Sequence, residues 1–372
     1  MLGAILLAGD SLAQDLTQAE RNRGVGDSPD VDLSAAANLR RDLTHDAVRA
    51  AMRKVADWQL ERARPYFNND WTFAALYDGF MAASATLGDP KYERAIWEVS
   101  SRLQWQLGRR PAHADDVAVG QTYLGLYRKR RDPQILRPLL DRFAYQMTLK
   151  DDPAKPIWWW CDALFMAPPT LARLYKATGK VEYLEYLDRE WWTTSALLYD
   201  PREHLFFRDS SYLDKREANG RKVFWLRGNG WVMGGLARVL DYMPKNYRAR
   251  SKFVAQFREM AAAVVGLQVE DGLWRPGLLD PRSYPLPEVS GSALLTYALA
   301  WGVNRGIFNR KVCAPVVKKA WAGLLTHIYS DGRLGCIQPV GAAPGRFQPA
   351  SSYVYGVGAF LLAGSEVDRL SQ

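Results

Sequence analysis

A lone carboxylate, Asp162, follows a cluster of aromatic side chains in the middle of the chain. The run Trp158–Trp160 and Cys161 come directly before it, and an apolar, helix-like run follows it. Aromatic surroundings keep water from a carboxyl group, and burial raises its pKa, which suits a proton donor or a general acid/base near neutral pH. An aspartate can equally begin a helix as its N-cap while the aromatic rings form core. This stretch alone gives the two interpretations even weight.

Two adjacent carboxylates, Asp115 and Asp116, precede another apolar helical segment. Paired carboxylates from separate segments are typical of enzymes that act on glycosides. Aspartate is also favoured at the start of a helix, where it interacts with free backbone N–H groups. We therefore expect one of the two residues to cap a helix and the other to face a cleft, and the spacing leaves open which does which.

The segment from Arg227 to Trp231 has two glycines, Gly228 and Gly230, on either side of an asparagine. The glycines predict a tight backbone turn with positive φ, which would present Arg227 and Trp231 one helical turn apart at the mouth of a cleft. Arginine suits a bidentate contact with a carboxylate, and tryptophan stacks on sugar rings. Arg208 would add positive charge. The other interpretation is a Gly-rich helix start whose arginine points to solvent.

Weaker signals come from further polar and aromatic residues, for which we expect structural or surface roles. They are Trp274, Arg275, Glu288, Ser290, His113 and His204. The four histidines and three cysteines show no metal-ligand spacing, and no Gly-rich phosphate loop is present. We therefore expect no metal, no cofactor and no disulfide framework.

The composition is that of an ordinary globular protein with unusually many tryptophans. Of the 372 residues, 48% are hydrophobic, 24% are charged and 14 are Trp, which fits either a sugar-binding cleft or a large helical core. The net charge of +9 comes from short basic groups without a basic arm or a nucleic-acid motif. This pattern predicts a solvated basic surface and no nucleic-acid partner, and it is compatible with an acidic substrate such as a uronic acid.

The first 40 residues differ from the rest. Residues 1–14 resemble the end of a secretory signal peptide with cleavage after Ala13, and they are too short for a membrane span. They predict export, to the periplasm or the medium, with a cytoplasmic location as the alternative because the usual basic segment before the apolar core is missing. Residues 15–40 are polar, so we expect a lead-in at 1–40 and a single catalytic domain at 41–372.

From about Asp42 onward, apolar residues recur at helical spacing. The pattern predicts twelve helices, at 43–63, 71–87, 90–107, 116–131, 133–149, 162–179, 181–197, 229–243, 248–267, 289–306, 311–326 and 353–368. They come in pairs. The first of each pair is apolar nearly all round and should be buried, whereas the second is amphipathic and should lie outside. This predicts an all-α fold, the (α/α)6 barrel. An open solenoid would show a regular repeat and polar capping repeats, and neither is present.

The segments that lead into the six buried helices should converge on one end of such a barrel. They hold the distinctive residues: Asn68–Trp71, His113–Asp116, Trp158–Asp162, Phe224–Trp231, Pro287–Ser292 and Tyr353–Gly356. Their convergence predicts one cleft with polar and aromatic walls. A position in this cleft favours a role for Asp162 as a general acid/base over a role as a helix N-cap. Trp71 and Asp116 join the predicted substrate contacts on this ground.

At these residues the chain resembles the unsaturated rhamnogalacturonyl hydrolases of glycoside hydrolase family 105, relatives of the family 88 unsaturated glucuronyl hydrolases. The resemblance rests on Ala114–Asp116 with Val119–Tyr123, Trp160–Pro168, Trp225–Trp231, Ala300–Gly302 and Tyr355–Phe360. It covers about residues 45–370 and implies an (α/α)6 barrel. It also implies a substrate whose nonreducing uronic acid carries a C4–C5 double bond.

The resemblance assigns roles to individual residues. It implies that Asp162 protonates C4 and activates the water that adds at C5, after which the hemiketal opens and the aglycone leaves. Asp115 matches a second aspartate that contacts the substrate and tunes the first. Four residues match positions that line the sugar subsite: Trp160, Trp225, Arg227 and Trp231. Arg208 stands where the family often has a loop histidine, which departs from its pattern.

We therefore predict an exported glycoside hydrolase that removes an unsaturated uronic acid from lyase-generated oligosaccharides. One alternative keeps the fold and the cleft but changes the reaction, as in a glucuronidase or a lyase. The other is a noncatalytic toroid that binds oligosaccharides.

Overall fold

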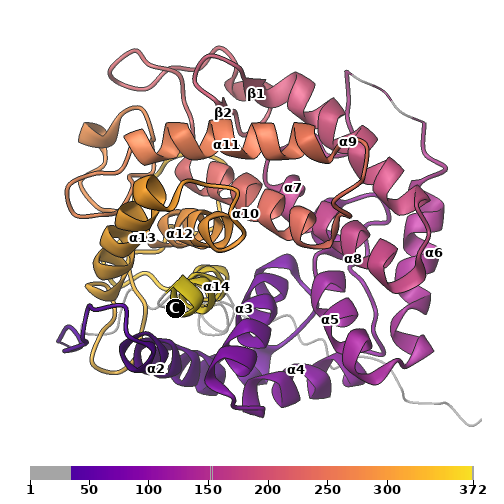
Figure 1. Ribbon diagram of the computed structural model, residues 1–372, viewed down its shortest axis with the longest axis horizontal. Coiled ribbons are helices and arrows are strands. Elements are labelled where there is room, and N and C mark those ends of the chain that lie inside the picture. The colour runs from indigo at the N-terminus through magenta and orange to yellow at the C-terminus, as the bar shows by residue number, and fades with distance from the viewer. Residues whose placement is uncertain (1–34, 151, 153, 371–372) are drawn as a thin grey trace, which may run out of the picture.

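Six helices form a closed inner ring in the computed structural model, which describes residues 35–150, 152 and 154–370 (Figure 1). The inner helices are α3 (Trp71–Leu87), α5 (Gly120–Arg130), α8 (Pro168–Thr178), α10 (Leu226–Tyr242), α12 (Val289–Asn304) and α14 (Val354–Leu370). Each contacts the next, and α14 returns to α3, so the ring is closed. Their apolar character explains their position, because a helix that is apolar all round is stable only when buried.

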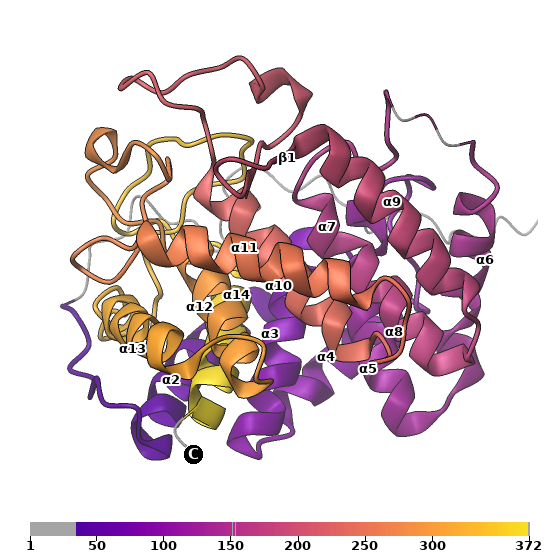
Figure 2. The same cartoon turned by 45° about the horizontal axis from the view of Figure 1, so that its top comes forward.

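Six further helices lie around this ring (Figure 2). They are α2 (His45–Ala63), α4 (Lys91–Arg102), α6 (Arg137–Gln146), α9 (Glu182–Leu198), α11 (Arg250–Gly266) and α13 (Arg310–Leu325). Helix α2 packs against both α3 and α14, so the first outer helix covers the junction where the ring closes. The predicted (α/α)6 barrel is confirmed, and the open solenoid is excluded.

One predicted helix, 162–179, is divided in two. The short α7 (Ala163–Met166) ends at Ala167, and α8 begins at Pro168. Proline has no N–H to continue the hydrogen bonds of the preceding turn, but it fits the first turn of a new helix. The break separates α7, which carries Asp162 at its start, from the longer helix behind it.

Short irregular elements connect the helices. They comprise strands β1 (Tyr199–Asp200) and β2 (Leu205–Phe206) and the 3-10 turns η1 (Arg64–Tyr66), η2 (Ala114–Val117), η3 (Pro133–Ile135), η4 (Ser210–Tyr212) and η5 (Pro281–Ser283). The strands pair antiparallel, with Tyr199 opposite Phe206. Further along the chain, Trp225 forms a single bridge with Gly277.

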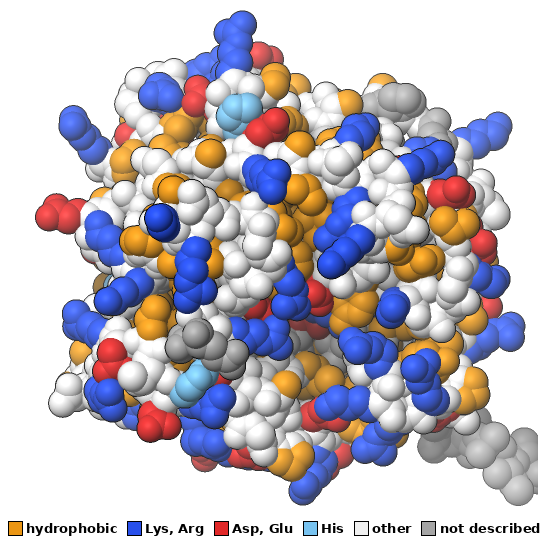
Figure 3. Space-filling view, viewed as in Figure 1, with side chains coloured by type: hydrophobic (Ala, Val, Ile, Leu, Met, Phe, Trp, Pro, Cys, Tyr) orange, Lys and Arg blue, Asp and Glu red, His pale blue; other side chains and the backbone are white. Residues whose placement is uncertain are grey.

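Lys and Arg side chains are spread over the surface rather than gathered in a stripe, as Figure 3 shows for one face. The three cysteines are buried and unpaired. No helix in the described part of the chain is long and apolar enough to cross a membrane. The predicted leader, residues 1–14, lies outside the described residues.

Candidate active site

Asp162 is buried at the start of α7, and its side chain caps no backbone N–H group. Its closest polar partner is the neighbouring thiol, with Cys161 Sγ 3.4 Å from Asp162 Oδ1. Helix α10 packs against this pair at Gly228, where a Cβ atom would lie 2.9 Å from Cys161 Sγ and 3.2 Å from Asp162 Oδ1. Glycine is therefore needed there for close approach. Asp162 occupies a helix start but does not use its carboxylate as a cap.

The pKa of the Asp162 carboxyl is raised above its ordinary value. Burial is the main cause, and the positive charges of Arg208 and Arg227 act against it without prevailing. Within the described residues Asp162 forms no ion pair. Buried carboxyl groups that lack a contacting cation favour the protonated form, which is the form that donates a proton.

Arg208 lies near the Asp162 carboxyl group, without an ion pair to it, because two loops pair beside this carboxyl group. Trp160 forms a bridge with Asp209, and the backbone N–H of Cys161 donates to the Arg208 carbonyl at 2.8 Å. The Arg208 guanidinium pairs with Asp209 (2.6 Å) and lies 5.2 Å from the ring centre of Trp159. Its Nε–H is buried and has no hydrogen-bond partner in the described structure, whereas the side chain as a whole is 18% exposed.

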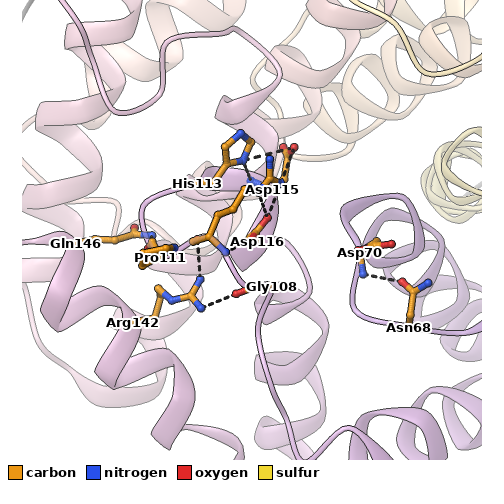
Figure 4. A network of polar contacts seen from close by, with 10 residues as sticks. Asn68, Asp70, Gly108, Pro111, His113, Asp115, Asp116, Arg142 and Gln146 are labelled. Atoms are coloured by element: carbon orange, nitrogen blue, oxygen red, sulfur yellow. Dashed lines mark hydrogen bonds and ion pairs between the residues drawn. The ribbon is translucent and has the colours of Figure 1, made fainter. Parts of the chain in front are cut away.

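Asp115 lies close enough to Asp162 for their charges to interact. Burial and the negative charge of Asp162 raise the pKa of Asp115 to about 7, against the opposing effect of Arg110. His113 accepts a hydrogen bond from the Asp115 backbone N–H (3.3 Å), and its Nδ1 lies 3.6 Å from Asp115 Oδ2 (Figure 4). The predicted convergence of these two carboxylates is therefore present.

Asp116 has a different environment from Asp115. Its carboxylate accepts hydrogen bonds from the backbone N–H of Arg110 (2.5 Å) and from the same residue's guanidinium (2.5 Å). These bonds close the loop that leads into η2, and helix α6 braces the loop from outside (Figure 4). There, Arg142 donates to the Gly108 carbonyl (2.6 Å) and Gln146 to the Pro111 carbonyl (2.8 Å). The expectation that one aspartate caps a helix is wrong, because His113 caps η2 and Asp116 holds Arg110.

Gly228 and Gly230 lie within helix α10, so the predicted turn with positive φ is wrong. The two glycines serve close packing instead, and Arg227 and Trp231 do lie one helical turn apart. The Arg227 guanidinium is buried and donates to the backbone carbonyls of Gln338 (2.6 Å) and Pro339 (2.8 Å). Arg227 therefore anchors a loop of the protein, and its contact with a substrate carboxylate stays a prediction.

Aromatic rings form a wall from α10 to α14. Trp71 stacks on Tyr355, with ring centres 5.4 Å apart, and meets Trp231 edge-on at 6.3 Å. Trp231 in turn contacts Phe165 at 4.6 Å. Trp225 and Trp231 are both buried, and Trp225 donates a hydrogen bond to Gln338 (3.0 Å), so Trp71 is the partly exposed ring of this wall.

Trp160 belongs to the opposite side of the cleft. Its ring centre lies 4.5 Å from that of His113. Sequence analysis gave His113 a loop role, yet it contacts Asp115 and Trp160 together. The signal that could have identified it is its position two residues before Asp115.

Comparison with known proteins agrees with this geometry. The model of Glycosyl Hydrolase Family 88 matches residues 43–371. This chain belongs to glycosyl hydrolase family 88. The family 88 chain is 41% identical to "Unsaturated 3S-rhamnoglycuronyl hydrolase" from Formosa agariphila, over 91% of this chain and 95% of that one.

Solved structures show the same architecture. A glycosyl hydrolase family 88 protein from Bacteroides vulgatus is 31% identical, with a TM-score of 0.83 over 88% of this chain and 99% of that chain. A protein described as a polysaccharide lyase is also 31% identical, with a TM-score of 0.83 over 88% of this chain and 98% of that chain. The family and the fold predicted from the sequence are confirmed.

The site of this family 88 enzyme also depends on polar residues that sequence analysis missed. Asn229 binds both backbone groups of Phe206, accepting from its N–H (2.8 Å) and donating to its C=O (3.0 Å). Glu288 caps α12 and accepts from the Gln338 backbone N–H (3.1 Å), so its expected structural role is confirmed. From the sequence, Asn229 is only the residue between two glycines, and nothing near Gln338 indicates that Gln338 has a role in the site.

Among the residues that the structure describes, no group of three or more His, Cys, Asp or Glu side chains is placed to hold a metal ion. The ionisable groups gathered at the site are the carboxyl groups of Asp115 and Asp162 and the guanidinium of Arg208.

Proposed function

We propose that this enzyme removes a 4,5-unsaturated uronic acid from the nonreducing end of an oligosaccharide by hydrating the C4=C5 double bond. One observation carries the proposal: the buried Asp162 and the partly buried Asp115, two carboxyl groups with raised pKa values, lie together beside Arg208. A protonated carboxyl group is needed to deliver a proton to carbon, and an arginine suits the carboxylate of the uronic acid.

In the proposed reaction, Asp162 gives its proton to C4 and positive charge develops at C5, stabilised by the ring oxygen. Water then adds to C5 and returns a proton to the Asp162 carboxylate, so the acid is restored. The resulting hemiketal opens to a ketone, which leaves a hemiacetal at C1. This hemiacetal collapses to an aldehyde and releases the next sugar as an alcohol.

The remaining groups have supporting roles in this mechanism. Asp115 shares the negative charge of the site with Asp162 and so keeps a proton available near neutral pH. The partly exposed guanidinium of Arg208 binds the uronate carboxylate. Trp71, which is partly exposed, provides the apolar face on which the sugar ring packs, and the buried Trp231 supports it edge-on.

We take the sugar that follows the uronate to be a rhamnose with a 3-O-sulfate group. Support comes from the 41% identical unsaturated 3S-rhamnoglycuronyl hydrolase, which matches 91% of this chain. The basic residues at the rim, Arg110 and Arg208, suit an anionic substrate of this kind.

The test is an assay on lyase-generated disaccharides, followed by ultraviolet absorbance and product analysis. The proposal requires the absorbance of the double bond to disappear as the unsaturated uronate is released. An increase in absorbance with a saturated polymer would indicate a lyase, which the similarity to a polysaccharide lyase makes the second candidate. Release of a saturated uronate would indicate a glucuronidase, and binding without turnover a noncatalytic toroid.

A further inference from the structure

A groove of about 620 Å³ lies beside the carboxylate pair. Its walls come from the loop before η2, the loop before Trp160, and the ends of α9 and of the β2–η4 loop. The lining residues are Arg110–His113, Ala154–Ile157, Trp159, Leu197 and Ser210. No member of this set is acidic, so the groove combines an apolar surface with the positive charges of Arg110 and Lys155.

Trp159 gives this groove a flat aromatic wall. Its side chain is 45% exposed, whereas the neighbouring Trp158 and Trp160 are buried. The Arg208 guanidinium lies 5.2 Å from its ring centre and holds the ring in place. When a sugar ring covers an exposed tryptophan, apolar surface is removed from water, which contributes favourably to the free energy of binding.

The groove borders directly on the reacting groups. Two of its lining residues also contact Asp115: His113 through Nδ1 (3.6 Å) and Arg110 through its guanidinium (3.7 Å from Oδ2). If the unsaturated uronate binds against Asp115 and Asp162, the next sugar of the substrate can therefore enter the groove. The bracing of this loop by Arg142 and Gln146 means that the wall is already formed without ligand.

We propose that this groove binds the sugar that follows the unsaturated uronate, with Trp159 packing on its ring and Lys155 binding its sulfate group. The proposal rests on the proposed function and assigns the part of the site that selects the aglycone. Lys155 carries the selectivity, because Arg110 is already engaged by Asp116. A sulfate ester is always ionised and offers three oxygen acceptors to an ammonium group.

A second cavity, of about 540 Å³, provides a competing location for the aglycone. It is lined by the loops at 276–286 and 344–347 and contains one cation, Arg346. These loops border the other side of the site, since Leu226 binds the carbonyl of Pro276. We assign the sulfate to the groove at Lys155 because two residues of that groove, Arg110 and His113, contact Asp115 directly.

The experiment compares kcat/KM for two unsaturated disaccharides that differ only in the sulfate on the second sugar. In the wild type the sulfated one should be preferred. Lys155→Ala should lower kcat/KM on the sulfated substrate about 10-fold or more, as expected for loss of a charge-assisted hydrogen bond, and should leave the unsulfated substrate nearly unchanged. Trp159→Ala should lower kcat/KM on both substrates.

Two matched variants serve as controls. Lys318→Ala removes an exposed lysine of α13, and Tyr145→Ala removes an exposed aromatic side chain of α6, so neither should change the sulfate preference. If Arg346→Ala removes the preference while Lys155→Ala keeps it, the sulfate binds in the other cavity and the proposal is overturned. Equal turnover of both substrates by the wild type would overturn it as well.

Failure of the proposed function would look different. In that case neither unsaturated disaccharide would lose its double bond in the wild type. Calorimetry with the sulfated disaccharide would still test the groove, because binding that depends on Lys155 and Trp159 requires no turnover. Binding that both variants retain would overturn the groove assignment independently.

Discussion

Asp78 and Asp162, two of the buried carboxylates of the barrel, have opposite electrostatic environments. Asp78, on α3 in the middle of the barrel, contacts the Arg238 guanidinium of α10 at 2.7 Å. Arg238 also donates to Gln121 (2.5 Å), which donates to the Phe165 carbonyl (2.8 Å). Asp162, at the rim, has nearby arginines but no ion pair in the described structure.

The same two forces act at both places, and a different one prevails at each. Burial acts to lower the pKa of Arg238, but Asp78 and other neighbouring groups outweigh it and the pKa is raised. At Asp162, burial raises the pKa, and Arg208 and Arg227 are not close enough to reverse the effect. A buried carboxylate in direct contact with a cation, such as Asp78, stays ionised and has a structural role. A buried carboxyl group without such a contact, such as Asp162, can exchange a proton.

The largest expected effect is the loss of catalytic activity when Asp162 is replaced. Asp162→Asn should lower turnover of unsaturated disaccharides about 10²- to 10⁴-fold, the usual contribution of a general acid. Because the folded protein disfavours the ionised carboxyl, the neutral amide should leave the free energy of unfolding unchanged or higher at neutral pH. Absorbance assays and chemical denaturation measure the two quantities. Undiminished turnover would remove Asp162 from the mechanism.

The next effect concerns stability at the middle of the barrel. Arg238→Leu leaves Asp78 buried without its partner and should lower the free energy of unfolding by about 3–5 kcal/mol. The double variant with Asp78→Leu removes both charges and should recover much of this loss. Denaturant titration of the three proteins checks the order. A single variant as stable as the wild type would show that the ion pair is not structural.

A third prediction uses pH. The pKa of Asp115 is about 7 in the folded protein against an ordinary value of 3.8, so the folded state holds an extra proton between these values. Stability from this group is complete below about pH 4 and is lost as pH rises through 7. Asp115→Asn should abolish this slope and raise the free energy of unfolding above pH 7 by at most about 4 kcal/mol.

Activity should follow the same titration. The carboxyl pair loses its last proton as pH rises above 7, so kcat/KM should fall there in the wild type. In Asp115→Asn the negative neighbour is gone, which makes Asp162 easier to ionise, so the fall should move to lower pH. An unshifted profile would mean that the two carboxylates do not interact.

The smallest effect is expected at Cys161. Its thiol donates a weak hydrogen bond to Asp162, which lowers the pKa of that carboxyl slightly against the effect of burial. Cys161→Ala should therefore move the alkaline fall in kcat/KM to higher pH, and Cys161→Ser, a stronger donor, to lower pH. Both variants should change the rate at the optimum by less than about tenfold. Identical profiles for all three proteins would leave the thiol without a role.

The fold was predictable because its determinants are periodic. Apolar faces mark α3, α12 and α14 as inner helices from sequence alone. The rim was also predictable, since the segments before the inner helices converge at one end of any such barrel. The break at Ala167 was marked by the paired prolines after it but was not recognised, because the apolar pattern continues across it.

Side-chain roles within the rim were less predictable, because they depend on contacts between segments far apart in the chain. Asp115 and Asp116 are adjacent, and only the loop geometry turns one toward Asp162 and the other onto Arg110. The glycines beside Arg227 predict a turn because glycine permits positive φ, yet glycine also permits helices to approach closely, which is its role here. A neighbouring element, the loop at Gln338, decides where the Arg227 side chain binds.

The contact between Trp71 and Tyr355 joins the first inner helix of the ring to the last. This wall of the cleft can form only after the ribosome has made α14, when all the other inner helices are already present. Such distant pairing favours slow, late assembly. Catalytic competence should therefore appear at the final step of folding, together with closure of the ring, and a chain interrupted before α14 would have its reactive aspartates without a cleft to hold the sugar.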